Sequence, residues 1–157
     1  LKLSYSYVLN MPLRIRKGQR PKYRMIHATN HRDGCLLMVD NICNRWQALQ
    51  DIQTCGQLTL WEENCENQIV DDEDIEKKTI EHFSQYKNYI SLYEALAAFF
   101  IKHGAICSTS IVKGIIKRLE KENRIEVVRN PATTKKGKLS SFMDEGKGKT
   151  IKIRWLQ

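Results

Sequence analysis

The sequence lacks a long apolar run, which argues against a helix that crosses a bilayer. Its longest such run, Ala95 to Ile101, is far shorter than the roughly 20 residues that a membrane span requires. The first residues also lack the basic start, apolar stretch and small-residue end of a secretory signal peptide. Proline and glycine are scarce, with 3 and 8 among 157 residues, which excludes a collagen-like chain. We therefore expect a globular, cytoplasmic protein of one domain or two small ones.

The sequence also lacks the glycine-rich and nucleophile motifs of common enzymes. It has no Gly-x-Gly-x-x-Gly, no phosphate-binding loop, no Gly-x-Ser-x-Gly and no His-Glu-x-x-His, the patterns that carry cofactor or catalytic chemistry. Gly146-Lys-Gly148 lies within a basic segment rather than between a strand and a helix, so it indicates a loop. We expect neither a cofactor-binding pocket nor a complete catalytic site in this chain.

Cysteine occurs five times but never in a Cys-x-x-Cys pair. The odd number argues against a disulfide framework, and the spacing argues against a zinc ribbon. Most of the five lie beside apolar residues, so we interpret them as reduced thiols of the core. They are Cys35, Cys43, Cys55, Cys65 and Cys107.

Charge is distributed unevenly around a net value of +8. Residues 1–60 carry 9 basic and 3 acidic side chains, residues 61–90 carry 3 and 9, and residues 91–157 carry 14 and 6. Two basic ends thus flank an acidic middle, an asymmetry typical of proteins that bind polyanions. Because the chain begins at Leu1 rather than Met, we treat it as a candidate fragment of a longer protein.

The first half of the chain is expected to form a hairpin followed by a helix. Alternating apolar residues predict a strand over 1–9, and a second strand is predicted over 22–29. Residues 10–21 contain two prolines and a glycine and are expected to form the loop between the strands. Apolar residues at helical spacing then predict a helix over 35–50, and a short extended piece follows over 57–61.

An acidic segment separates this part from the second half. We interpret residues 62–73 as a linker, because residues 62–76 hold eight acidic residues and no basic one. Beyond it the pattern indicates a helix, a helix-turn-helix, a strand, a long basic loop and a returning strand, the order of a winged helix-turn-helix. The expected elements are helices over 74–87, 91–103 and 108–121, strands over 124–129 and 150–155, and a loop over 130–149. The predicted domains are therefore 1–61 and 74–157.

The second helix of the helix-turn-helix and the basic loop form a candidate nucleic-acid interface. Such a helix can lie along the major groove while its apolar face stays packed, and loop lysines suit phosphate contacts. The candidate nucleic-acid-binding residues are Thr109, Ser110, Lys113, Lys117, Lys135, Lys136, Lys138 and Lys147. The alternative is a protein-interaction domain with solvated lysines, because the start of the helix offers no Arg, Asn or Gln to read bases.

A polar cluster at the end of the second predicted strand is a separate catalytic candidate. Asn30, His31 and Asp33 lie where α/β proteins commonly place ligands. His27 precedes His31 by four residues, but no third metal ligand is near in the sequence, so we assign no metal site. The competing interpretation of the cluster is a hydrogen-bonded turn.

The chain resembles the C-terminal part of the three-Cys-motif partner proteins in two longer segments and a short one between them. One is Lys22-Tyr-Arg-Met-Ile-His-Ala-Thr-Asn-His-Arg-Asp-Gly34, and the other is Ile115-Ile-Lys-Arg-Leu-Glu-Lys-Glu-Asn-Arg-Ile125, with Gly56-Gln-Leu-Thr-Leu-Trp61 between them. Proteins of that family join a Rossmann-like, methyltransferase-type domain to a C-terminal winged helix and are associated with radical S-adenosylmethionine proteins. The resemblance implies an α+β chain: the terminal hairpin and helix of a Rossmann-like domain, followed by a winged helix-turn-helix.

The resemblance implies no cofactor site within this chain. The family's cofactor-binding loops would lie before Leu1, so S-adenosylmethionine and methyltransferase activity are implied only for a full-length protein. The three cysteines that name the associated family are not the five found here. We therefore expect a nucleic-acid-binding winged helix next to a methyltransferase-like domain. The alternative is a module that docks a radical S-adenosylmethionine protein, or forms a homodimer, without contact to nucleic acid.

Overall fold

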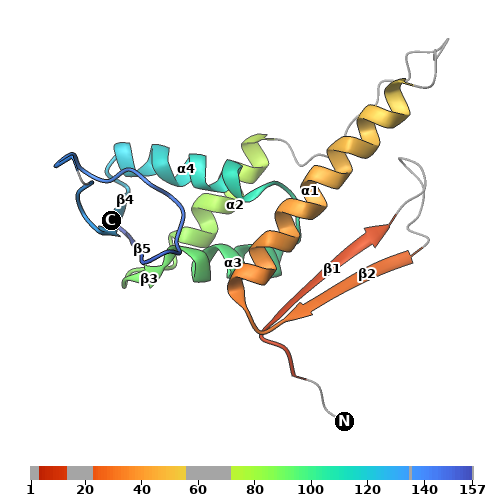
Figure 1. Ribbon diagram of the computed structural model, residues 1–157, viewed down its shortest axis with the longest axis horizontal. Coiled ribbons are helices and arrows are strands. Elements are labelled where there is room, and N and C mark those ends of the chain that lie inside the picture. The colour runs from red at the N-terminus through yellow and green to blue at the C-terminus, as the bar shows by residue number, and fades with distance from the viewer. Residues whose placement is uncertain (1–3, 14–22, 56–71, 135, 157) are drawn as a thin grey trace.

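The computed structural model describes residues 4–13, 23–55, 72–134 and 136–156. Within these ranges the chain forms four helices and two small antiparallel sheets (Figure 1). The expected α+β class is thereby confirmed. None of the helices in these ranges has both the length and the apolar character needed to cross a membrane.

The predicted hairpin is present, but its first strand lies further along the chain than expected. β1 (Tyr7–Leu13) pairs antiparallel with β2 (Tyr23–Thr29). Residues 4–6 lie outside the strand, whereas residues 10–13, expected in the loop, lie within it. Among the described strands β1 pairs with β2 alone, and such an edge strand tolerates Pro12, which has no backbone N–H to donate. The prediction of a strand over 1–9 was therefore wrong in its boundaries.

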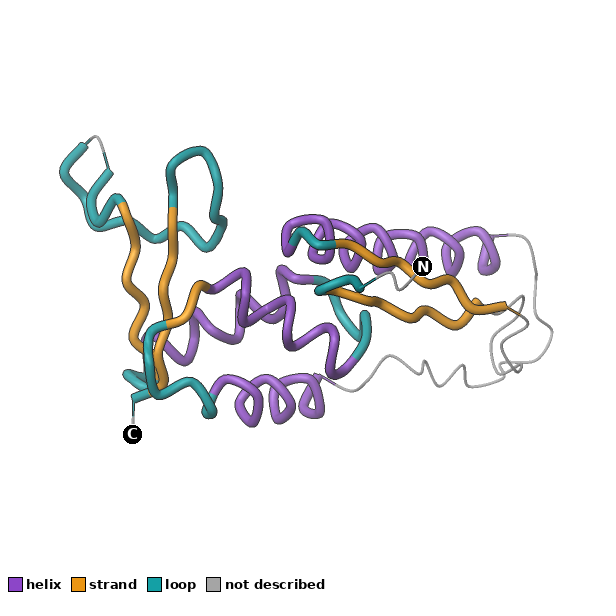
Figure 2. Tube along the Cα trace, turned by 90° about the horizontal axis from the view of Figure 1, so that it is seen from below, coloured by secondary structure: helices purple, strands orange, loops and turns teal. Residues whose placement is uncertain are grey.

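Helix α1 (Arg32–Cys55) is longer than the helix predicted over 35–50. It begins directly after β2, where the His31 carbonyl accepts a hydrogen bond from the Cys35 amide at 3.1 Å. Residues 32–34, which precede the predicted helix, therefore already form its first turn. The helix runs beside the hairpin (Figure 2), and its buried face packs against the hairpin and α3 (Leu92–His103).

The second half contains the expected helices and strands in the expected order, with shifted boundaries. α2 begins two residues before the predicted start at Asp74 and ends before the predicted end at Lys87, and the two-residue strand β3 was not predicted. The three strands form one antiparallel sheet in the order β3-β5-β4. The remaining elements are α2 (Asp72–Phe83), β3 (Ile90–Ser91), α4 (Thr109–Lys121), β4 (Ile125–Asn130) and β5 (Thr150–Trp155).

The two halves share one apolar core. Leu9 of β1 and Val39 of α1 are buried in the same cluster as Phe99 and Phe100 of α3. Removing such side chains from water is the main favourable term in folding, so the hairpin and α1 are stabilised by their contact with the second half. The division into domains at 1–61 and 74–157 stays a prediction, and residues 62–71 of the expected linker lie outside the described residues.

Three cysteines lie in or beside this core as free thiols. Cys35 and Cys107 are buried in the core and Cys43 is half-buried against it, as expected for core residues, and their reduced state stays a prediction. Burial raises the pKa of Cys43 to about 11 and that of Cys107 to about 12, so both stay protonated at neutral pH and are poor nucleophiles. The side chains of Cys55 and Cys65 lie outside the described part.

A pair of histidines joins α2 to α3. The buried His82 ring lies 6.2 Å from the His103 ring, and its Nε2 donates to the Ala95 carbonyl at 3.1 Å. His82 Nδ1 and His103 Nε2 are buried and have no hydrogen-bond partner among the described residues. Burial lowers the pKa of both rings, because an apolar environment disfavours the charged form. The fold therefore favours neutral imidazoles here.

We expect the fold to lose stability as the pH falls from about 7.5 to about 5. The unfolded chain titrates its histidines near pH 6.5, above the lowered pKa of His82 and His103. Below pH ~6.5 the unfolded state therefore binds more protons, and stability declines until the buried rings also titrate. Urea unfolding across this range measures the effect.

The double variant His82→Gln and His103→Gln should flatten this pH dependence. His31→Gln changes an exposed histidine and serves as the control for loss of an imidazole. An unfolding free energy of the wild type that stays constant from about pH 7 to about pH 5.5 would contradict the assignment.

Candidate nucleic-acid interface

Helix α4 (Thr109–Lys121) presents a buried apolar side and an exposed polar side. Val112, Ile116 and Leu119 are fully buried, and they recur at the spacing of one face of a helix. The opposite side exposes Ser110, Gly114, Lys117 and Lys121. Two of the lysines of the predicted basic stripe, Lys117 and Lys121, therefore face away from the core.

Thr109, a candidate nucleic-acid-binding residue, lies inside the protein instead. Only 4% of it is exposed, and its amide and hydroxyl donate to the two carboxylate oxygens of Asp40 on α1, each at 2.8 Å. Ser108, at the N-cap position, makes no side-chain cap bond, so a carboxylate from another helix caps α4. An acidic group is favourable at a helix N-terminus. The Thr109 hydroxyl therefore stabilises the contact between α4 and α1 instead of facing a ligand.

Lys113 also has a partner within the protein. Its Nζ lies 2.8 Å from Asp144 Oδ1 and 5.0 Å from the centre of the Tyr93 ring. Only 15% of the Lys113 side chain is exposed. The hydrogen bond from Lys113 lowers the pKa of Asp144, which keeps this carboxyl ionised and the pair intact. The sequence predicted that Lys113 contacts nucleic acid, but in the structure Asp144 compensates its charge.

The β4–β5 loop, residues 131–149, is fastened to the rest of the fold by Glu145. Its side chain is 4% exposed and lies 3.0 Å from Arg32 Nη2. It also accepts hydrogen bonds from the Ser91 hydroxyl at 3.0 Å and from the Tyr93 amide at 3.3 Å. Because Arg32 belongs to α1 and Ser91 precedes α3, one buried carboxylate joins the loop to two helices. A buried charge that is paired in this way is costly to disrupt.

A second fastening holds the start of the loop. Arg129 at the end of β4 forms a bidentate pair with Glu120 of α4 at 2.6 and 2.7 Å. Its Nε donates to the Phe142 carbonyl at 2.9 Å. Bidentate arginine–carboxylate pairs fix geometry as well as charge. The base of the loop is therefore held against α4.

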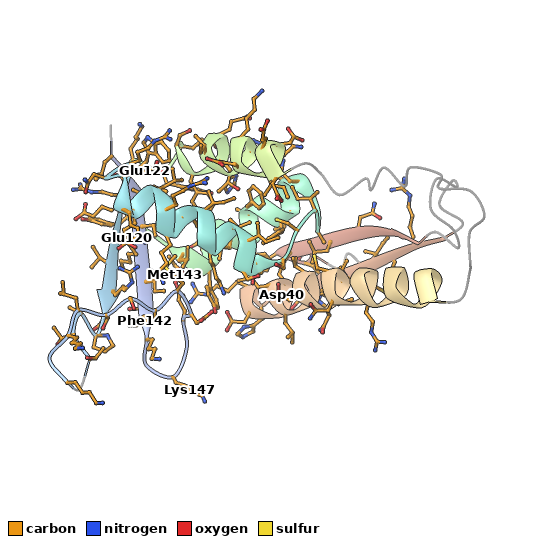
Figure 3. All side chains as sticks on the ribbon, turned by 90° about the horizontal axis from the view of Figure 1, so that it is seen from above. Asp40, Glu120, Glu122, Phe142, Met143 and Lys147 are labelled. Atoms are coloured by element: carbon orange, nitrogen blue, oxygen red, sulfur yellow. The ribbon has the colours of Figure 1, made fainter. Side chains whose placement is uncertain are left out.

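The remaining lysines of the loop are exposed. Lys136, Lys138 and Lys147 point to solvent, and Lys135 lies outside the described residues. Figure 3 shows Lys147 at the outer end of the loop. Within the described ranges, no carboxylate forms an ion pair with these three lysines or with Lys117. Their charges therefore remain available to a bound anion.

A groove of about 430 Å³ runs between α1, α4 and the β4–β5 loop. Asp40 on α1 and Met143 in the loop, both labelled in Figure 3, border it. Ser110 and Gly114 contribute to it from α4. The groove therefore lies over the exposed side of the first half of α4. Its lining residues are Asp40, Thr109, Ser110, Lys113, Gly114, Lys117, Met143 and Asp144.

Of the catalytic candidates, Asn30 and His31 lie in the connection from β2 to α1, and Asp33 lies in the first turn of α1. Asn30 Oδ1 accepts a hydrogen bond from the Ser6 amide at 2.9 Å, and the His31 amide donates to Thr29 Oγ1 at 3.1 Å. Within the described part, no hydrogen bond joins these three side chains to one another. The described residues also contain no group of three or more His, Cys, Asp or Glu arranged to hold a metal. These contacts favour the turn interpretation.

Comparison of the chain with protein-family models, with curated proteins and with solved structures gave no match. No relative therefore supplies a function or a functional residue. The evidence for an interface consists of the exposed side of α4, the fastened β4–β5 loop and the groove between them.

We expect Asp40→Ala to lower the free energy of unfolding by about 1–3 kcal/mol, because it removes two hydrogen bonds to an ionised acceptor and leaves the Thr109 donors buried. Asn41→Ala changes the exposed neighbouring residue on α1 and controls for helix propensity. Urea unfolding of both variants measures the difference. Equal stabilities for the two variants would mean that the Asp40–Thr109 bonds contribute nothing net.

Proposed function

We propose that residues 72–155 form a winged helix-turn-helix that binds nucleic acid. The order α2, β3, α3, α4, β4, β5 and the sheet order β3-β5-β4 support this proposal. In such a fold α4 is the helix that meets the nucleic acid, and the β4–β5 loop serves as the wing.

The observation that carries the proposal is the set of exposed lysines on α4 and the β4–β5 loop. Lys117, Lys136, Lys138 and Lys147 have no ion-pair partner among the described residues. Arg129 fastens the start of the loop and Glu145 fastens its later part, so the loop lysines project from a defined position. A field of one sign on an exposed surface attracts polyanions and suits phosphate contacts.

The proposed mode of binding depends on the backbone more than on base sequence. The proposed contacts with nucleic acid omit Thr109 and Lys113, because Thr109 is hydrogen-bonded to Asp40 and Lys113 is paired with Asp144. Ser110 is the predicted candidate on the first turn of α4 that stays exposed. Phosphate contacts fix register but carry no sequence information. We therefore expect affinity for duplex nucleic acid with little preference among sequences.

Binding should weaken steeply as salt is added. Each neutralised phosphate contributes about −0.9 to the log-log slope of affinity against salt, so four lysine contacts predict a slope near −4. The double variant Lys136→Ala and Lys138→Ala should flatten the slope by up to about 2 and weaken binding to all sequences alike. Fluorescence anisotropy with a labelled DNA duplex at several salt concentrations measures both quantities.

The double variant Lys77→Ala and Lys87→Ala removes the same charge from exposed positions away from the loop. It should leave the slope close to that of the wild type. If both double variants flatten the salt dependence equally, the effect comes from the net charge of the protein and not from the lysines of the β4–β5 loop. If the wild type fails to bind duplex or single-stranded nucleic acid at about 50 mM salt, where such contacts are strong, the proposed function is wrong.

A second candidate function is docking of a protein partner. Val8 and Ile26 are 45% and 67% exposed, and the register places them on one face of the hairpin. Exposed apolar side chains grouped on one face mark interaction surfaces. The partner would be a second copy or the radical S-adenosylmethionine protein that the resemblance implies. Sedimentation equilibrium separates the two functions: this candidate takes precedence if the chain dimerises, Val8→Lys with Ile26→Lys abolishes the dimer, and no nucleic acid binds.

A further inference from the structure

Gly114 stands in the middle of α4 although the described structure does not require glycine there. A glycine inside a helix lowers its stability relative to alanine, because it loses more conformational freedom on folding. A Cβ built on Gly114 would meet nothing within 4 Å. Packing inside the protein therefore does not explain the missing side chain.

Gly114 lies on the side of α4 that faces the groove. It follows Ser110 by four residues and precedes Lys117 by three, and all three line the groove between α1 and the β4–β5 loop. Positions with these separations share one face of a helix. The missing side chain therefore exposes the helix backbone between Ser110 and Lys117.

Two carboxylates, Asp40 and Asp144, and two lysines, Lys113 and Lys117, line the groove. Asp40 accepts both of its hydrogen bonds from Thr109, and Asp144 is paired with Lys113. Lys117 lines the groove, and Lys147 and Lys149 lie in the neighbouring loop. Both carboxylates thus have partners within the protein, whereas Lys117 has no ion-pair partner among the described residues and can contact an anion.

We propose that Gly114 is the point of closest approach between α4 and a bound nucleic-acid duplex. The inference rests on the proposed function and adds to it a residue that carries no charge. Glycine permits another backbone to come closer than any side chain would allow. Gly114 thereby limits how deeply the duplex sits between Lys117 and the loop lysines.

The test compares two substitutions at Gly114 with one at Ile111. Gly114→Ala and Gly114→Gln both introduce residues that favour a helix more than glycine does. Ile111 is exposed on α4 and does not line the groove, so Ile111→Gln is the matched control for a glutamine on this helix. Each variant is melted, and its affinity for one DNA duplex is measured by fluorescence anisotropy at constant low salt.

We expect both Gly114 variants to melt at or above the temperature of the wild type. Gly114→Gln should weaken duplex binding by about tenfold and Gly114→Ala by less, whereas Ile111→Gln should stay within about twofold. A variant that is more stable and yet binds more weakly separates a contact with the duplex from a role in folding.

Each other result overturns the inference in a distinguishable way. If the wild type and Gly114→Gln bind the duplex equally well, Gly114 is not the point of approach, and the proposed function still stands. If the wild type does not bind, the inference and the proposed function fail together. If Gly114→Gln does not fold, the space around Gly114 has a structural use, and the inference is also refuted.

Discussion

The hydrogen bonds from Thr109 to Asp40 fix the arrangement on which the candidate interface depends. One carboxylate on α1 satisfies the first amide and the first hydroxyl of α4, and so it sets where α4 begins and which helix lies beside that end. Asp40 also borders the groove, so the same bonds join two of its sides, α1 and α4. The same bonds remove Thr109 from the surface. The N-terminal end of α4 therefore serves the fold, and its exposed middle and C-terminal half remain for a ligand.

Two neighbouring acidic residues of the β4–β5 loop each compensate a different positive side chain. Asp144 pairs with Lys113, whereas Glu145 is buried against Arg32 and Ser91. The charge of Lys113 on α4 is therefore compensated, whereas Lys117 and the exposed loop lysines have no ion-pair partner among the described residues. In the proposed complex, the duplex would be attracted toward Lys117 and the loop lysines rather than toward the first residues of α4.

Local sequence patterns predicted the elements better than the site. The apolar spacing of Val112, Ile116 and Leu119 was enough to predict α4, because it reports the helix's own buried face. The same pattern could not show that Asp40, 69 residues before Thr109, would cap this helix, or that Asp144 would pair with Lys113 from 31 residues away. Such pairs depend on tertiary packing. Exposed lysines were predictable, since no partner had to be identified.

The way the β4–β5 loop is held bears on how its lysines can act. A loop that is free along its whole length would lose much conformational entropy on binding, and that loss would weaken affinity. Here Arg129 holds the start of the loop to Glu120, and Glu145 holds its later part to α1 and α3. An isolated antiparallel β-bridge between Thr133 and Leu139 further restricts the conformation of the loop. Part of the ordering cost is thus met during folding, so in the proposed complex the exposed lysines of this loop would contribute more to binding than the same charges on an unfastened chain.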